Sequence, residues 1–217
     1  MMTSKSKRFR ILEQELKKLR KYFLPHQFDP LGNYRERQIA LATAYRVLAH
    51  AEFESYLEDR VVEIAINALK IWKNSNQTTI TLVSLFAFSG LSLDKPPDSL
   101  IANQQPQKIL EEKLILDRKL GKAFNSFKNS VENNHGIREK NILLLLLPIG
   151  VNSEDLDRIW LQEIDDFGKK RGEFAHQSAS NDKTRQPPDP KNELEMVNRL
   201  LQGLIHIDRL LNDLLKR

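Results

Sequence analysis

The chain has 217 residues, of which 40% are hydrophobic and 29% are charged, and its formal net charge is +5. This composition predicts a globular protein with one good core and at most two small domains, and it excludes a disordered chain. The longest purely apolar run, residues 142–147, is far too short to span a membrane, and we expect no secretory signal after Met1. The absence of cysteine excludes disulfides, thiolate metal sites and cysteine nucleophiles, and it fits a cytoplasmic protein.

Positive charge is concentrated at the start of the chain. Residues 1–21 hold eight lysines or arginines against two glutamates, so the remainder is close to neutral. Residues 4–24 place apolar side chains at spacings of three and four, which predicts an amphipathic helix with the cations on its other faces. Such a basic arm favours a polyanionic partner such as RNA or DNA, although a solvated helix face explains the same charges.

The next two segments differ in how clearly the sequence predicts their secondary structure. Residues 34–73 contain neither proline nor glycine, and their apolar spacing predicts one long helix or two abutting helices. Residues 78–93 begin with β-forming residues, but an isolated strand has no partner, so we prefer a short buried helix that begins near Thr81. Residues 94–106 hold three prolines and are predicted to be a loop.

The second half of the chain returns to helical spacing. We expect Asn152 or Ser153 to cap the helix that carries the most distinctive residues, and a polar loop at 177–191 to follow it. No convincing series of strands is present, so the prediction is an all-α bundle. We divide it into a basic N-terminal helix and turn, 1–32, and a helical domain, 33–217. The helical segments of this half are 107–132, 138–147, 152–179 and 192–216.

Arg171 and His176 stand five positions apart near the end of the 152–179 segment, directly behind Lys169 and Lys170. On an ideal helix Arg171 lies at the centre of the apolar stripe that includes Phe167, whereas His176 lies about 140° away. A guanidinium in that stripe needs a partner or a wet interface between helices. The two side chains can converge if the helix distorts, if the arginine reaches, or if a second subunit contributes.

This pattern resembles the HEPN superfamily, whose motif is an arginine, four to six residues and a histidine near the end of a late helix. Its RiboL-PSP branch has an early helix with a segment similar to Ala-Glu-Phe-Glu-Ser-Tyr-Leu-Glu at 51–58. Its late helix has an aromatic anchor and an acidic stretch, matched here by Trp160 and by Asp165 and Asp166. The resemblance covers roughly 34–215 and implies an HEPN-like helical bundle, here with an extra basic N-terminal helix.

The resemblance implies a metal-independent endoribonuclease that acts as a homodimer, with Arg171 and His176 of both subunits lining one cleft. Many such proteins serve as toxins or antiviral effectors, so a cognate antitoxin or a defence-system partner is implied too. The family usually has Asn, Asp or His directly after the arginine, where this chain has Gly172. Glycine loosens a helix by about 1 kcal/mol relative to alanine, so Gly172 either weakens catalysis or allows a bend.

The chemistry is reasonable from the residue types. RNA cleavage by the 2′-hydroxyl requires a base, an acid for the departing 5′-oxygen and a cation for the phosphorane, which histidine and arginine supply. One chain has one suitable histidine, so two chains would complete the pair; no cofactor is required, and no histidine cluster with metal-ligand spacing occurs. The other predicted site residues are Glu52 and Asp166, which would orient the site, and Lys169, Lys170, Lys17, Lys18, Arg20 and Lys21, which would contact the RNA backbone.

Alternatives stay open at this point. Arg171 and Glu52 can form a purely structural pair, and His176 can simply end a helix. The chain would then be a non-catalytic, HEPN-like protein that binds nucleotides or RNA or serves as a scaffold. A DNA-binding regulator that uses the basic arm is a weaker alternative, since no helix-turn-helix spacing is evident.

Overall fold

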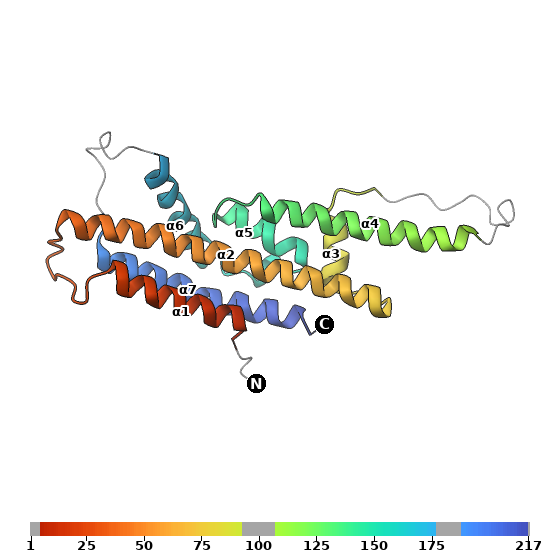
Figure 1. Cartoon of the computed structure of the whole chain (residues 1–217), viewed down its shortest axis with the longest axis horizontal. Helices are drawn as coiled ribbons and strands as arrows, with labels where there is room; N and C mark the ends of the chain where they lie inside the picture. Colours follow the sequence, from red (N-terminus) through yellow and green to blue (C-terminus); the bar gives the residue numbers. More distant parts are fainter. Residues whose placement is uncertain (1–4, 93–106, 177–187, 217) are drawn as a thin grey trace.

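The structure of the chain is a computed structural model that describes residues 5–92, 107–176 and 188–216, with side chains described at 5–92, 115–170 and 188–216. The described residues form seven α-helices and two short 3-10 turns, with no strand among them, which confirms the all-α prediction (Figure 1). The elements are α1 (Lys7–Phe23), α2 (Glu36–Ser75), α3 (Ile80–Phe88), α4 (Gln107–Glu132), α5 (Glu139–Leu146), η2 (Leu147–Ile149), η3 (Ser153–Asp155), α6 (Arg158–His176) and α7 (Pro190–Leu214).

The long helix α2 is the centre of the bundle, because it packs against all six other α-helices. Its 40 residues form one helix rather than two, since no glycine or proline interrupts them. It ends where Asn76 takes the left-handed conformation, with φ of 54°. The fully buried side chains along α2 include Tyr45, Phe53 and Leu57. Elements that contact different faces of α2 are therefore separated from one another by its width.

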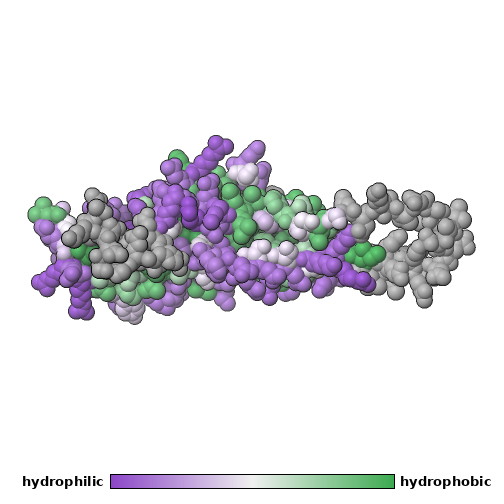
Figure 2. Space-filling view, turned by 90° about the horizontal axis from the view of Figure 1, so that it is seen from above, coloured by the Kyte–Doolittle hydropathy of each residue, from purple (hydrophilic) through white to green (hydrophobic). Residues whose placement is uncertain are grey.

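The segment that was hardest to predict is the short helix α3. Thr79 caps it by accepting a hydrogen bond from the Leu82 amide at 3.2 Å, and the Thr81 hydroxyl donates to the Ile149 carbonyl at 2.8 Å. The predicted helix is confirmed, whereas the predicted loop at 94–106 lies outside the described residues. Figure 2 shows apolar residues gathered near the middle of one face, over the part of the molecule where Figure 1 places α4 and α5.

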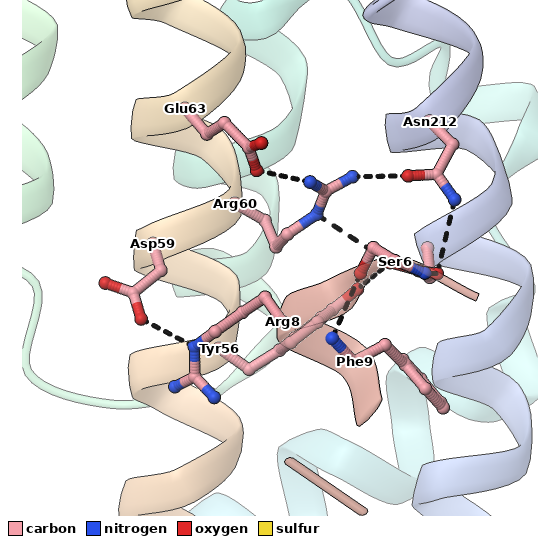
Figure 3. A network of polar contacts seen from close by, with 9 residues as sticks. Ser6, Arg8, Phe9, Tyr56, Asp59, Arg60, Glu63 and Asn212 are labelled. Atoms are coloured by element: carbon pink, nitrogen blue, oxygen red, sulfur yellow. Dashed lines mark hydrogen bonds and ion pairs between the residues drawn. The ribbon is translucent and has the colours of Figure 1, made fainter. Parts of the chain in front are cut away.

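The basic helix α1 packs on α2 and shares one hydrophobic core with the rest of the bundle, so the predicted boundary at 32–33 falls in the turn between two elements of that core. Its first turn is held by a buried polar network (Figure 3). Asp208 of α7 accepts hydrogen bonds from the Ser6 amide at 2.8 Å and from the Tyr56 hydroxyl at 2.7 Å. Burial, together with Asp208, raises the pKa of Tyr56. Arg60 lies 3.7 Å from Asp208 and donates to Asn212 at 2.7 Å.

The start of the motif-bearing helix differs from the prediction. Asn152 accepts a hydrogen bond from the Glu154 amide at 3.2 Å, but it caps the short turn η3. Leu156 is then extended and 5% exposed, so the chain leaves the helical path in order to bury this side chain. The helix α6 begins only at Arg158, where Asp157 accepts from the Ile159 and Trp160 amides at 2.8 and 3.3 Å.

Candidate functional site

The helix α6, which carries the Arg-x4-His motif at its end, crosses α7 at close range. The indole of Trp160 donates to the Leu200 carbonyl at 2.9 Å, and a Cβ on Gly203 would lie 2.0 Å from Trp160 Cδ1. Only glycine at 203 therefore allows this crossing. The buried side chains of Trp160, Ile164 and Phe167 confirm most of the described apolar stripe, whereas Ile159, which has the same apolar spacing, is 73% exposed.

Arg171 and His176 are placed by their backbone alone, because the described side chains of α6 end at Lys170. The α-helix continues unbroken through both positions and ends at His176. Five residues of α-helix turn the two positions about 140° apart, as expected for an undistorted helix. A distortion of the helix was one of the three expected ways to bring the two side chains together, and the backbone of α6 shows no such distortion. In Figure 1 the last turns of α6 extend away from α2 and α7.

Two side chains of α2 lie beneath the last described turns of α6. The ring of Phe167 stacks on His50, with 6.2 Å between centroids, and meets Phe53 edge-on at 6.4 Å. His50 is 1% exposed, and its Nδ1 lies 3.6 Å from a carboxylate oxygen of Glu54. Arg171 follows Phe167 by four residues, so the His50–Glu54 pair lies one helical turn before the motif.

A buried ion pair and a small cavity complete this end of the bundle. Arg46 of α2 and Glu193 in the first turn of α7 are both buried and form two hydrogen bonds, one of 2.7 Å from Nε. Beside them lies a cavity of about 150 Å³ between α2, α6 and α7, lined among others by Phe167, Lys170 and Arg199. Charged groups of both signs therefore lie beside the α6 turn that precedes the motif.

The two predicted acidic residues of α6 have different surroundings. Asp165 is half-buried and accepts from Arg138 Nε and from the Glu139 amide at 3.1 Å each, which fastens α6 to the start of α5. Burial acts to raise the pKa of Asp165, but hydrogen bonds from Lys169, Glu139 and Arg138 outweigh it and lower the pKa. Asp166, the residue expected to orient the site, is exposed, and its described contact is Lys169 at 3.5 Å.

The predicted cations beside the motif are both exposed on α6. Lys169 lies 2.6 Å from Asp165, and this hydrogen bond raises the pKa of Lys169. Lys170 lines the cavity between α2, α6 and α7. The structure therefore brings Lys169, Lys170 and Asp166 next to the turn that holds Arg171.

The cations of α1 and Glu52 lie elsewhere. Lys17 and Lys21 are exposed, Lys18 pairs with Glu15 at 2.6 Å, and Arg20 lies over the Phe28 ring at 5.8 Å. The hydrogen bond that Lys18 donates to Glu15 and, to a smaller extent, the charge of half-buried Glu52 raise the pKa of Lys18. Glu52 thus lies near α1.

The faces of α2 show how far apart these groups are. Asp59 binds Arg8 of α1 at 2.6 Å, whereas His50 stacks on Phe167 of α6. Nine residues of α-helix place Asp59 and His50 about 180° apart, so α1 and α6 pack on opposite sides of α2. Within one chain, the structure does not bring the predicted α1 cations to the motif helix.

The family model RiboL-PSP-HEPN matches residues 7–213. The chain belongs to the RiboL-PSP-HEPN family. The match runs from the start of α1 into α7, so in this HEPN chain it includes the basic helix that the resemblance over 34–215 left out. No curated protein and no solved structure matches the chain.

His50 and Glu54 were not among the predicted site residues, because their sequence signals are weak. His50 was one of several scattered histidines, yet it shares an α2 face with Phe53 and Leu57, at spacings of three and four. No group of three or more metal-ligating side chains occurs among the described residues of this HEPN chain. Among the same residues, no helix is long and apolar enough to cross a membrane.

Proposed function

We propose that this RiboL-PSP-HEPN protein is a metal-independent endoribonuclease whose site combines Arg171 and His176 of two copies of the chain. The observation that carries the proposal is the Arg-x4-His motif at the end of α6, in a chain that matches the family over residues 7–213. The motif stands at the end of a helix that extends from the bundle in Figure 1, where a second copy and RNA can reach it.

The proposed reaction uses the RNA's own nucleophile. A His176 imidazole takes the 2′-hydroxyl proton as the 2′-oxygen attacks phosphorus, and the second copy's His176 gives a proton to the departing 5′-oxygen. Arg171 binds the phosphorane oxygens with its fork of donors. The products are a 2′,3′-cyclic phosphate and a 5′-hydroxyl. Two histidines are required because one residue cannot act as base and acid in the same step.

The described surroundings support this assignment. The turn of α6 before the motif is anchored on α2 by Phe167 and on α5 by Asp165, so the helix is held on two sides. Lys169 and Lys170 are exposed beside it and supply positive charge for an RNA backbone. The α1 cations Lys17 and Lys21 lie on the opposite side of α2. They can contact the same RNA only if it passes around the end of the bundle or if they belong to the second copy.

The test is RNA cleavage in EDTA by the wild type, His176→Ala and Arg171→Ala, with His135→Ala as the matched control because His135 is exposed in the turn before α5. We expect each motif variant to lose at least about 100-fold in rate. The control should stay within about twofold, and product ends should be 2′,3′-cyclic phosphates. Equal cleavage by all four proteins, or none by the wild type on a broad RNA set, contradicts the proposal.

We further propose that the activity serves as a toxin or an antiviral-defence effector. Induced expression of the wild type should then slow growth of a bacterial host, and His176→Ala should not.

The alternative function is a non-catalytic HEPN-like protein that binds nucleotides or RNA or acts as a scaffold. It is favoured by Gly172, which stands where the family usually has a polar residue, and it predicts RNA binding without cleavage.

A further inference from the structure

A second surface lies away from the motif helix. The helices α3, α4 and α5 and the turn η2 surround a groove of about 300 Å³. Its walls are mostly apolar, and the lining includes Phe88 from α3, Phe127 from α4 and Leu144 from α5. In Figure 1 these elements occupy the middle of the molecule and the end opposite to the His176 end of α6.

Large apolar side chains are exposed at this groove and beside it. Phe88 is 60% exposed and Leu144 is 46% exposed, and Ile80 and Val83 of α3 are each about half exposed. The nine residues of α3 include no charged residue, so even its outward face is apolar. A surface helix normally presents polar residues outward, and contiguous exposed apolar groups mark interaction sites.

The charge on the described lining of the groove is positive. Among the described residues that line it, Lys140 is the one ionisable side chain, and the other polar groups are hydroxyls of Ser89, Ser126 and Ser130. Lys122, one turn before Ser126 on α4, is exposed as well. No carboxylate occurs among the described side chains of this lining. An occupant with carboxylates next to an apolar stripe would be electrostatically complementary.

We propose that the α3–α4–α5 groove binds an amphipathic helix of a second protein, one that carries aspartates or glutamates beside its apolar stripe. A helix suits the groove because its apolar residues at spacings of three and four can enter between Phe88, Phe127 and Leu144. A second copy docked through the same face would bring Lys140 and Lys122 of each copy toward like charges. The groove is separate from the motif helix, so this inference does not rest on RNA cleavage.

The experiment uses two synthetic helical peptides of about four turns, alike in a leucine stripe but with glutamate or lysine flanking it. Fluorescence anisotropy with the full chain should show that the glutamate peptide binds at least about tenfold more tightly. Leu144→Glu should weaken this binding about tenfold or more, and Lys140→Glu should remove the preference for glutamate. Ile159→Glu is the matched control, because Ile159 is 73% exposed on α6, away from the groove.

Several results would overturn the proposal. Absence of binding by the glutamate peptide, equal binding of both peptides, or an equal loss in Ile159→Glu would each exclude the assigned occupant or the assigned place. Light scattering tests whether a second copy of the chain occupies the groove instead. If Leu144→Glu dissociates an oligomer of the wild-type chain, the groove is an interface between copies and the proposed partner helix is wrong.

Discussion

The two sides of α2 use polar residues in different ways. On the side of α1 and α7, Asp208, Tyr56 and Arg60 are buried and joined in one network that also holds the first turn of α1. The side of α6 also holds the buried Arg46–Glu193 pair, but there Lys169 and Lys170 stay at the surface near the motif. A buried network of this kind stabilises one arrangement of helices, whereas exposed charges remain available to a ligand. The first side therefore builds the bundle and the second presents the candidate site.

The largest expected effect separates these sides by stability. Asp208→Ala removes the acceptor for Ser6 and Tyr56 and leaves Arg60 buried without this carboxylate, so the free energy of unfolding should fall by about 3–5 kcal/mol. Asp213→Ala, one turn or so further along α7, is the control, because its ion pair with Lys216 is largely exposed and should change stability by less than about 0.5 kcal/mol. Urea unfolding followed by circular dichroism measures both, and equal losses would show that the network is not special.

The next effect concerns the crossing that positions α6. Gly203→Ala should destabilise by about 1–3 kcal/mol, because its Cβ would overlap the Trp160 ring, despite the higher helix propensity of alanine. Gly121→Ala in α4 has open space within 4 Å and should stabilise by about 0.5–1 kcal/mol. Thermal unfolding of the two variants should therefore shift in opposite directions. A gain in both would mean that Trp160 moves freely.

The smallest effect distinguishes the neighbouring carboxylates of α6. Asp165→Asn should cost about 1–2 kcal/mol at pH 7, because Asp165 binds Arg138, Lys169 and the Glu139 amide as a carboxylate. Asp166 is exposed, so Asp166→Asn should change the free energy of unfolding by less than about 0.5 kcal/mol.

The pH dependence follows from the sign of the shift. The pKa of Asp165 is lowered in the fold, so its contribution is complete above the unfolded value of about 3.9 and is lost as the pH falls through the folded value. The cost of Asp165→Asn should therefore shrink between pH 7 and pH values below about 4. If the cost of Asp165→Asn is constant across this range, the contact between α5 and α6 does not depend on the charge of the carboxylate.

Much of the helical pattern was predictable because helix formation leaves a local trace. Apolar spacing placed α2, α4 and α7 to within a few residues, and the absence of glycine and proline predicted that α2 could be continuous. The start of α6 was not predictable in the same way. Asn152 and Asp157 are both good caps, and the burial of Leu156, a long-range effect, selects the second for the helix.

The same distinction between local sequence signals and long-range packing applies to the motif and its surroundings. The positions of Arg171 and His176 near the end of a late helix, and the angle of about 140° between them, follow from sequence spacing and helix geometry alone. Periodicity describes the faces of each helix but not which helix meets which face. Packing places α1 and α6 on opposite sides of α2, joins Asp165 rather than Asp166 to α5, and brings the His50–Glu54 pair beneath Phe167. These contacts join residues far apart in the chain, so only the buried area and hydrogen bonds of the folded bundle determine them.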